Sequence, residues 1–497
     1  MIPITTQEEL EELKKNNPNL VLWAGGAGEF VSTPTPLTFD LILQPFNHDY
    51  LWKKTATILK MPFEHSSEPY FYSIKNHSYV NITSEYRTFY GPRLSGITVS
   101  DEYSKPQPLL KINIKNIFNT TVHALKSTVW QANLLQPIFI QKLLSDIQDN
   151  LELIVSEGKT KSNHDDIQPL LFEGLAYITA LGIIDGFFEQ YVIQVIKPNY
   201  ITKWNGIESL LQEKIRNKDE YFQSMNQLGD VHERKITLRT YLERFGQRAF
   251  DDYELSAPRF SEIQSELNEI IRTYSSLSPL SNHGLHTAID KQDQHILNTY
   301  VEIRALRGSM KLLFLQLIAH TRSLLITFAK FNKIPSDLIF FFHSDELQHL
   351  QKHLKNAEKR RYEYEKNILT YLPPVIAGEH YVFEKVVSSM NQKSIQATPI
   401  SQGNVTGFLK KISKEQAYSN VDLQHHIIIL PDASPHFTHL YPQSAGILFL
   451  QGGVTSHGAI IAREYHKPAV SLGGNILELS EQTLVNLNGT TGEITLI

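Results

Sequence analysis

The chain has 497 residues, of which 41% are hydrophobic, 20% charged and 10% aromatic. This composition is typical of a folded globular protein. The length exceeds the roughly 250 to 300 residues that one hydrophobic core can organise, so two to four domains are expected. The net charge of -5 gives no overall attraction to nucleic acid or to an anionic membrane, and we expect neither as a partner. With no cysteine in the sequence, disulfides, thiolate metal ligands and cysteine nucleophiles are excluded.

The N-terminal segment is predicted to begin with a helix. Thr6 is followed three residues later by Glu9, which is the spacing of a capping box at a helix start. The same segment lacks the basic and then apolar order of a signal peptide. We therefore expect no leader and a cytoplasmic protein.

Residues up to about 108 mix short apolar runs with glycine and proline, which predicts a small β-containing part. The stretch FYSIKNHSYVNIT alternates around Asn76 and His77 as a hairpin does. The glycine-rich piece from Gly25 to Gly28 lacks the lysine and hydroxyl of a phosphate-binding P-loop. We interpret it as a tight turn.

From about residue 109 to residue 371 the apolar residues recur with helical spacing, which predicts a mostly α-helical body. The most apolar long stretch, residues 312–331, contains Gln316, His320 and Arg322. A buried amphipathic helix is therefore favoured over a membrane span.

A change of pattern near residue 390 predicts a second domain. Pro373 and Pro374 end the last long helix, and VVSSMNQKSIQATP, residues 386–399, is predicted to be a polar linker. Beyond it, short β runs alternate with short helical segments; the runs are GNVTGFL, HHIIIL, AGILFL, PAVSL, TLVNLN and a closing strand in GTTGEITLI. We predict an α+β multi-domain fold, with a mostly helical domain at residues 1–390 and an α/β domain at residues 391–497.

The segment GGVTSHGAIIAREYHKPAV, residues 452–470, places a histidine at the start of a predicted helix. Thr455 or Ser456 can cap that helix, so His457 is expected in its first turn. Free N–H groups and the helix dipole stabilise an anion there by about 0.3 to 1 kcal/mol per charge. Neutral imidazole is nucleophilic near pH 7, so His457 is a candidate phosphoryl acceptor. Taken alone, a histidine in this position is more often a capping or packing residue.

This segment resembles the mobile domain of phosphoenolpyruvate-utilising enzymes, the group that contains pyruvate phosphate dikinase, phosphoenolpyruvate synthase and rifampin phosphotransferase. In that family the histidine of the TSH triplet carries the phosphoryl group, a role that the resemblance assigns to His457. ATPISQGNVTGFL and LPDASPHFTHL are similar as well, whereas Gln451 stands where the family commonly has glutamate. We predict that the phosphate is held by Gly453, Thr455, Ser456, Gly458 and Arg463.

Fainter similarity extends to the helical substrate domain that precedes the mobile domain in rifampin phosphotransferase and related kinases. It rests on GEFVSTPTPLTFDLI, FGQRAFDDYELSAPRFSE and SDLIFFFHSDELQHL. The domain order is similar to that of the antibiotic-kinase branch and differs from that of the dikinases, where a barrel follows.

The second of these segments, residues 245–262, concentrates charged side chains that could bind a polar acceptor and position a base. The predicted substrate-binding residues are Arg248, Asp252, Glu254 and Arg259. A solvated loop with internal ion pairs is the alternative. Family members often have histidine where this chain has Gln247, and glutamine cannot act as a general base. Either a nearby carboxylate activates the acceptor, or this chain does not perform that step.

Three further basic residues, Arg304, Lys311 and Arg322, fall on one face of a predicted helix. Eighteen residues of helix span roughly 27 Å, so these side chains cannot all bind one phosphate. We expect most of them to form structural ion pairs.

The family's ATP-grasp nucleotide-binding domain is expected to lie outside this chain, since no stretch of it supplies a credible ATP site. The resemblance then implies a split system, in which a separate ATP-grasp protein phosphorylates His457. ATP and Mg²⁺ are expected on that partner, with no cofactor or metal bound by this chain itself. A small-molecule acceptor in the helical domain would receive the phosphoryl group. The alternative is a non-catalytic binding or regulatory protein that retains the fold.

Overall fold

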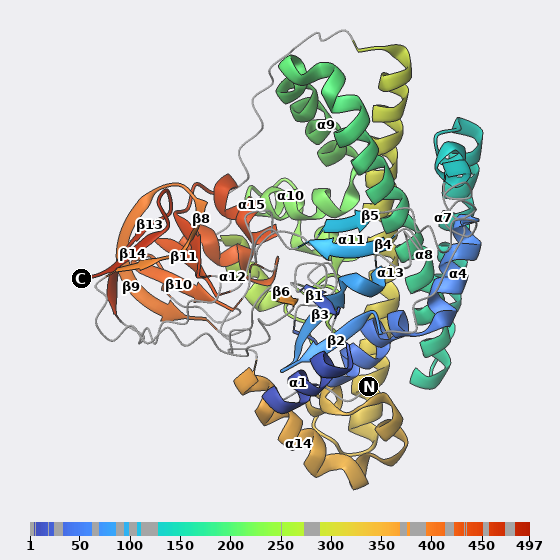
Figure 1. The fold of residues 1–497 in the computed structure, drawn as a ribbon. Helices are drawn as coiled ribbons and strands as arrows, with labels where there is room; N and C mark the ends of the chain where they lie inside the picture. Colours follow the sequence, from blue (N-terminus) through green and yellow to red (C-terminus); the bar gives the residue numbers. More distant parts are fainter. Residues whose placement is uncertain are drawn as a thin grey trace.

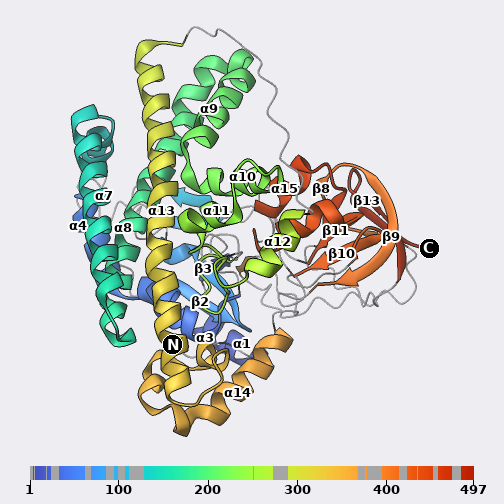
Figure 2. The same ribbon diagram turned by 180° about the vertical axis from the view of Figure 1, so that it is seen from behind.

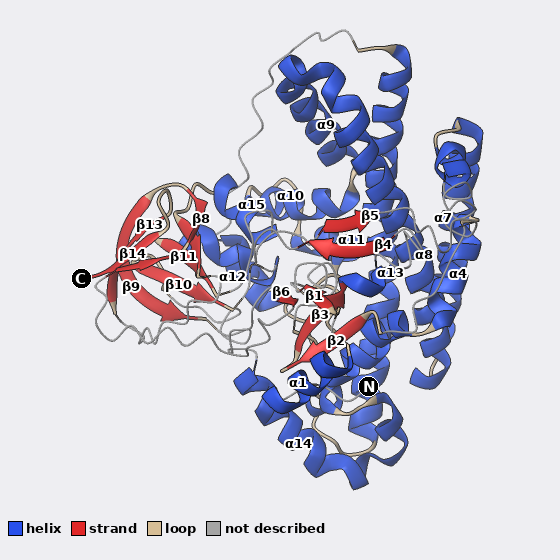
Figure 3. Ribbon diagram, in the orientation of Figure 1, coloured by secondary structure: helices blue, strands red, loops and turns tan. Residues whose placement is uncertain are grey.

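The computed structural model describes most of the chain. The described residues are 4, 6–17, 19–23, 33–61, 69–85, 94–98, 107–110, 128–249, 251–272, 289–367, 375–377, 394–412, 422–431, 433, 435–450, 457–472 and 483–497. A mostly helical body is followed by a C-terminal domain built around a large sheet, as the colouring by secondary structure shows (Figure 3). A mixed α and β fold is therefore confirmed.

The N-terminal part contains a four-stranded sheet in the order β2-β3-β1-β6, with β1 at Val21–Trp23, β2 at Phe71–Ile74, β3 at His77–Asn81 and β6 at Val375–Ala377. The predicted hairpin is β2-β3, with its turn at Lys75 and Asn76, where φ is 45° and 63°. His77 already lies in the strand. The edge strand β6 comes from the far end of the body, so the chain must fold back before this sheet is complete. A second, two-stranded sheet pairs β4 (Leu94–Thr98) with β5 (Gln107–Leu110).

The helix α1 (Gln7–Asn16) carries the predicted capping box. The Thr6 side chain accepts from the Glu9 N–H at 3.2 Å, and the Glu9 carboxylate accepts from the Thr6 N–H at 3.0 Å. The predicted turn at Gly25 to Gly28 lies outside the described residues.

The body is dominated by long helices that pack side by side (Figures 1 and 2). They include α4 (Asp49–Leu59), α7 (Pro137–Thr160), α8 (His164–Tyr191), α9 (Trp204–Lys218), α10 (Glu220–His232), α11 (Leu238–Phe245), α12 (Gln264–Arg272), α13 (Lys291–Phe331) and α14 (Leu350–Asn367). Shorter helical segments are α3 (Pro36–Thr38), η1 (Phe39–Leu43), η2 (Gln44–Asn47), η5 (Val192–Ile196), η6 (Lys197–Lys203), η7 (Leu338–Phe341) and η8 (Ser344–His349).

Helices α8 and α13 form the centre of the body. Close approach of α8 to α13 requires Gly174, since a Cβ there would lie 2.5 Å from the Phe314 ring. Two stretches, His164–Lys203 and Lys291–Phe331, are long and apolar enough to cross a membrane by length and composition. Their apolar windows are 56% and 50% buried inside the protein, as core helices would be, and α13 also buries Thr321 and Arg322.

The C-terminal sheet has eight strands in the order β7-β14-β13-β9-β10-β11-β12-β8. Their bounds are β7 Ser394–Gln396, β8 Thr398–Ser401, β9 Asn404–Lys411, β10 His426–Leu430, β11 Gly446–Phe449, β12 Ala469–Ser471, β13 Leu484–Asn488 and β14 Glu493–Leu496. The four central strands β9 to β12 are parallel and the outer strands are antiparallel. All six predicted β runs form strands.

Both faces of this sheet are buried, which explains the continuous apolar run of β10. Side chains alternate between faces along a strand. Ile428 and Leu430 face the short helices η10 (Pro435–Gln443) and α15 (His457–Glu464), whereas Ile427 and Ile429 join a separate core with β7, β13 and β14. We call the first of these the helix-covered face.

The predicted linker at residues 386–399 is wrong in its second half. The strands β7 and β8 lie in that half, because Ile395 and Ala397 are buried in the core on the face of the sheet opposite the helix-covered face. The predicted boundary between residues 390 and 391 lies outside the described residues. The apolar clusters of the body draw on residues 4–376, and those of the C-terminal domain on residues 395–494.

Candidate functional site

The first candidate site is the start of α15, whose first residue is His457. This helix connects the parallel strands β11 and β12, so it begins at the carboxyl edge of the sheet, where parallel α/β sheets commonly bind ligands. In Figures 1 and 2, α15 lies on the side of the C-terminal domain that faces the body. The histidine is thus in the first helical turn, as predicted. The predicted residues Gly453, Thr455 and Ser456 lie outside the described part of the chain.

Gly458 packs tightly within its own domain. Its N–H donates to the Ala433 carbonyl at 2.9 Å, and it is buried against Tyr441. A Cβ at this position would lie 2.6 Å from the Tyr441 hydroxyl and 2.7 Å from the Ala433 oxygen. The absence of a side chain therefore lets α15 approach η10, and this N–H is already engaged inside the domain.

Arg463 lies in the last turn of α15 and is exposed. Its Nη1 donates to the Ile400 carbonyl at 3.2 Å, next to the end of β8. Six helical residues separate it from His457, about 9 Å along the axis. Its contribution to phosphate binding stays a prediction.

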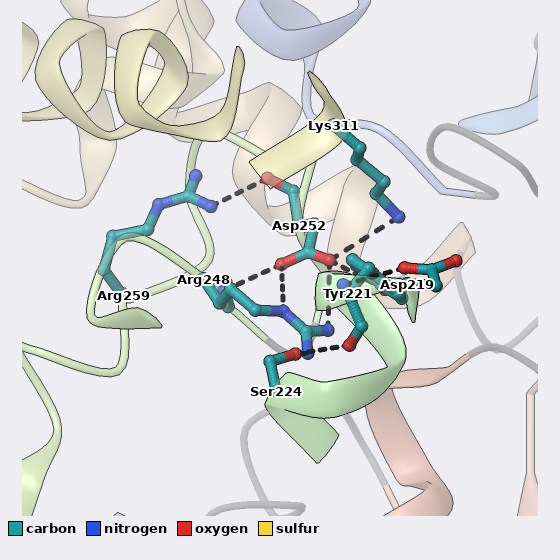
Figure 4. Close-up of polar contacts among 8 residues, drawn as sticks. Asp219, Tyr221, Ser224, Arg248, Asp252, Arg259 and Lys311 are labelled. Atoms are coloured by element: carbon teal, nitrogen blue, oxygen red, sulfur yellow. Dashed lines mark hydrogen bonds and ion pairs between the residues drawn. The ribbon is translucent and has the colours of Figure 1, made fainter. Parts of the chain in front are cut away.

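The second candidate site is a buried group of charged side chains in the body, which we call the Asp252 cluster (Figure 4). It consists of Asp252 and the side chains that bind its carboxylate or its immediate partners: Arg248, Lys311, Tyr221 and Ser224. Arg248 and Asp252 come from the motif after α11, Tyr221 and Ser224 from α10, and Lys311 from α13. Three segments distant in sequence therefore meet at one carboxylate.

In the cluster, two cations share one buried carboxylate, and the Lys311 side chain is partly exposed. Asp252 Oδ2 lies 3.2 Å from Arg248 Nη2 and 3.6 Å from Lys311 Nζ, and it accepts from the Tyr221 hydroxyl at 2.9 Å. Arg248 also donates to Ser224 Oγ. Both cations lie over the Tyr221 ring, Lys311 at 3.9 Å and Arg248 at 4.1 Å from its centroid.

The surrounding charges decide the protonation of Asp252. Burial alone would raise the pKa of its carboxyl group, but the charges of Arg248 and Lys311 act in the opposite direction and lower that pKa to about 2. Hydrogen bonds from the Ala249 N–H and the Tyr221 hydroxyl add to the same effect. Asp252 is therefore ionised at neutral pH and is a weak base.

The other two predicted substrate-binding residues are engaged by the protein itself. Glu254 Oε1 accepts from the hydroxyls of Thr35 and Thr38 at 2.8 and 2.7 Å, and Oε2 accepts from the Thr35 N–H at 3.1 Å. Arg259 donates to the carbonyls of Asp252 and Glu254 at 2.7 and 2.8 Å. Glu254 fastens the motif to Thr35 and to Thr38 of α3, whereas Arg259 holds the backbone of the motif itself together. Binding of an acceptor by them stays a prediction.

All four predicted substrate-binding side chains are buried, with exposures of 1% to 6%, so the motif is no solvated loop. Tyr221 and Ser224 were not foreseen as members of the site. They are one turn apart on α10, a spacing common to every helix, so no local signal distinguishes them. Only the packing of α10 against the motif reveals them.

The predicted structural ion pairs of α13 are confirmed. Arg304 pairs with Asp185 at 2.7 Å, Lys311 with Asp252 at 3.6 Å, and Arg322 with Glu262 at 2.9 Å. Each of the three cations pairs with a different carboxylate. Within the described ranges, no group of three or more histidine or acidic side chains is arranged to hold a metal ion.

Comparisons with known proteins agree with the geometry of the C-terminal domain. Residues 423–492 match the family described as the mobile domain of PEP-utilising enzymes. This matched segment, which includes α15 and His457, therefore belongs to that family.

Relatives extend the similarity into the body. The chain is 26% identical over 340 residues to YvkC, an uncharacterised phosphotransferase of Bacillus subtilis (strain 168). This match covers 59% of this chain and 39% of that protein. It is 36% identical over 97 residues to pyruvate, phosphate dikinase of Rickettsia prowazekii (strain Madrid E), covering 19% of this chain and 10% of that protein. It is 29% identical over 132 residues to pyruvate, phosphate dikinase 2 of Zea mays, and this match covers 24% of this chain and 15% of that protein. The chain spans less than half the length of each of these relatives.

Proposed function

We propose that the protein is a cytoplasmic phosphotransferase component of the rifampin phosphotransferase-like branch, which carries a phosphoryl group on His457. The donor is a separate ATP-grasp protein that binds ATP and Mg²⁺. The acceptor is a small molecule held by the helical body. One observation carries this proposal: the segment that matches the PEP-utilising mobile domain has its histidine as the first residue of α15, at the carboxyl edge of a parallel sheet.

The proposed chemistry is two successive displacements at phosphorus. In the first, a neutral ring nitrogen of His457 attacks the phosphorus of the donor. The N–P bond forms while the P–O bond to the donor's leaving group breaks, and the electron pair leaves with that oxygen. In the second, an acceptor oxygen attacks the same phosphorus and loses its proton to a base, while the N–P electron pair returns to the ring.

The Asp252 cluster is the proposed place of the acceptor in the body. Its cations, Arg248 and Lys311, can stabilise negative charge near an acceptor oxygen. Asp252 would hold these two cations in position instead of removing the acceptor's proton, because its pKa is lowered to about 2. Arg259 and Glu254 would support the cluster through the motif backbone.

The test is transfer of label from Mg-[γ-³²P]ATP and Mg-[β-³²P]ATP to the full chain, in the presence of an ATP-grasp protein encoded beside it. We expect an acid-labile, base-stable phosphate on the wild-type chain, as for a phosphoramidate. His457→Ala should remove it. His425→Ala is the matched control, because His425 is an exposed histidine of the same domain, and it should label like the wild type. Label that persists in His457→Ala would show that His457 is not the nucleophile. Failure of the wild-type chain to accept label would favour a non-catalytic binding protein.

A further inference from the structure

A buried carboxylate between α8 and α13 has only one of its two oxygens engaged. Asp185, on α8, has an exposure of 1%. Its Oδ2 accepts from Arg304 Nη1 at 2.7 Å and from Arg307 Nη1 at 2.6 Å, both on α13. Its Oδ1 is buried and has no hydrogen-bond donor among the described residues. Two cations are therefore gathered on one oxygen, while the second oxygen can accept a further hydrogen bond.

The carboxylate of the Asp252 cluster, by contrast, uses both of its oxygens. Asp252 Oδ1 accepts from the Ala249 N–H at 3.0 Å, and Oδ2 accepts from the Tyr221 hydroxyl and contacts two cations. A buried carboxylate oxygen without a donor is costly, because hydrogen bonds compensate the loss of water on burial. The engagement of only one Asp185 oxygen therefore indicates a donor from outside the chain, either a water molecule or a ligand.

The surroundings of Asp185 favour an anionic ligand. The Arg304 and Arg307 side chains are 31% and 32% exposed, so both cations reach solvent although their carboxylate partner does not. Arg304 also lies over the Tyr300 ring, 5.7 Å from its centroid, which restrains the guanidinium. Glu189 acts on the Arg304 charge as well, but more weakly than Asp185 does. The two arginines thus present exposed positive charge beside a buried oxygen that lacks a donor.

Open space for a ligand lies next to Asp185 on α8. Gly182 precedes it by three residues and Gly186 follows it directly, and neither glycine is buried. A Cβ on either glycine would meet no atom within 4 Å. At Gly174, where α8 and α13 pack tightly, a Cβ would lie 2.5 Å from the Phe314 ring. The two helices run side by side in Figures 1 and 2, and they leave room beside Asp185 that they do not leave at Gly174.

We propose that Asp185, Arg304 and Arg307 form a binding site for inorganic phosphate. The arginines donate to the unprotonated oxygens, and the O–H of the monohydrogen phosphate dianion donates to Asp185 Oδ1. A phosphate monoester loses its last proton with a pKa of about 6, and sulfate carries no proton at neutral pH. Both would place a lone pair against the carboxylate oxygen. The site therefore selects the oxyanion that keeps a proton above neutral pH.

This site is independent of the proposed phosphoryl transfer. It is separate from the Asp252 cluster, whose Lys311 lies four residues after Arg307, about 6 Å along α13. Phosphate binding requires nothing of His457. The site can therefore be tested whether or not His457 is the carrier.

Isothermal titration calorimetry of the full-length chain tests the site, at about pH 8 and constant ionic strength. The three ligands are potassium phosphate, potassium sulfate and glycerol 3-phosphate. We expect phosphate to bind with a dissociation constant below about 1 mM. Sulfate and the monoester should bind about 10- to 100-fold more weakly, because neither can donate to Asp185. Equal binding of phosphate and sulfate, or no binding of phosphate, would overturn the site and leave water as the donor.

Substitutions test the selectivity itself. Asp185→Asn keeps the shape and adds an N–H that can donate to sulfate, so the ratio of the two affinities should fall to about one. Arg304→Gln should weaken both anions and leave the ratio high. The control is Arg361→Gln, because Arg361 is 44% exposed and pairs with Asp337 on another surface of the body, and it should bind phosphate like the wild type. A wild-type ratio in Asp185→Asn, or unchanged binding in Arg304→Gln, contradicts the inference.

A further variant decides the case in which Asp185→Asn does not fold. A helical side chain covers the turn that precedes its own Cα, so Gly186→Leu fills the space beside Asp185. A Cβ at Gly186 meets no atom, and the variant should therefore melt like the wild type while it binds phosphate at least about tenfold more weakly. Wild-type affinity in this variant would place the anion elsewhere and overturn the proposal. His457→Ala should bind phosphate normally, which separates this test from labelling of the carrier.

Discussion

At the scale of single residues, the Asp252 cluster shows how a charged motif can be buried. Its carboxylate is 6% exposed and is stabilised by two cations and the Tyr221 hydroxyl. Removing one member of such a network leaves the others buried and uncompensated, which costs more than the network itself contributes to stability.

We therefore expect Asp252→Asn to lower the free energy of unfolding of the body by about 3 to 5 kcal/mol. Arg248 and Lys311 would keep their positive charges without a counter-ion. Urea denaturation followed by circular dichroism measures the effect. The control is Glu243→Gln, which breaks the exposed pair of Glu243 with Arg239 and should change the value by less than about 0.5 kcal/mol. A similar small change for Asp252→Asn would show that the cluster is hydrated in solution.

The lowered pKa of Asp252 predicts a pH dependence of stability. Its carboxyl has an ordinary pKa of 3.8 and a folded value of about 2. The stabilisation, on the order of 2 kcal/mol, is complete above pH 4 and is lost as the pH falls from 4 to 2. The difference in unfolding free energy between the wild type and Asp252→Asn should therefore shrink across that interval. A difference that stays constant from pH 6 to pH 2 would contradict the assignment.

At the scale of elements, α15 depends on close contact with η10. The contact is made at Gly458, one residue after the proposed carrier, where the Ala433 carbonyl and the Tyr441 hydroxyl leave no room for a side chain. The backbone position of His457 is thus coupled to the packing of its own domain.

Gly458→Ala should displace α15 and destabilise the C-terminal domain by about 1 to 3 kcal/mol, the usual cost of overpacking. It should also slow phosphorylation of His457, since the two residues are adjacent. Thermal unfolding and labelling by phosphoramidate are the measurements. The matched control is Gly182→Ala in α8, where a Cβ would meet nothing within 4 Å, and this change should raise stability slightly. Gly458→Ala with wild-type stability and rate would show that α15 has space to move.

At the scale of the whole molecule, the apolar cores divide between the body and the C-terminal domain, while one short strand ties the end of the body to its beginning. β6 pairs with β1, and its residues Val375 and Ile376 are buried among N-terminal side chains. Separate cores are compatible with the proposed carrier role, in which His457 would have to reach a donor and an acceptor.

A fragment of residues 1–390 should keep the stability of the body, whereas a fragment of residues 1–370 should lose several kcal/mol. The shorter fragment lacks β6 and the burial of Val375 and Ile376, each worth about 1.5 to 3 kcal/mol. Urea denaturation of the two fragments gives the comparison. Equal stabilities would show that β6 adds nothing to the sheet at the start of the chain.

The sequence by itself determined the local features of the protein. Periodicity located the helices of the body and the strands of the C-terminal domain, because apolar spacing follows directly from helix and strand geometry. The Thr6 and Glu9 cap and the β2-β3 hairpin depend on contacts a few residues apart, so they could be predicted. The TSH triplet identified His457 as the candidate carrier through its resemblance to the mobile domain of PEP-utilising enzymes.

The tertiary structure decided what joins segments distant along the chain. Ile395 looked like part of a polar linker, and only its partner strand β14 makes it a core residue. Tyr221 and Lys311 contact Asp252 because α10 and α13 pack against the motif. The sequence around Tyr221 and Lys311 does not predict that contact. Burial and pairing are properties of the packed molecule, so they determine which charged and polar residues form sites.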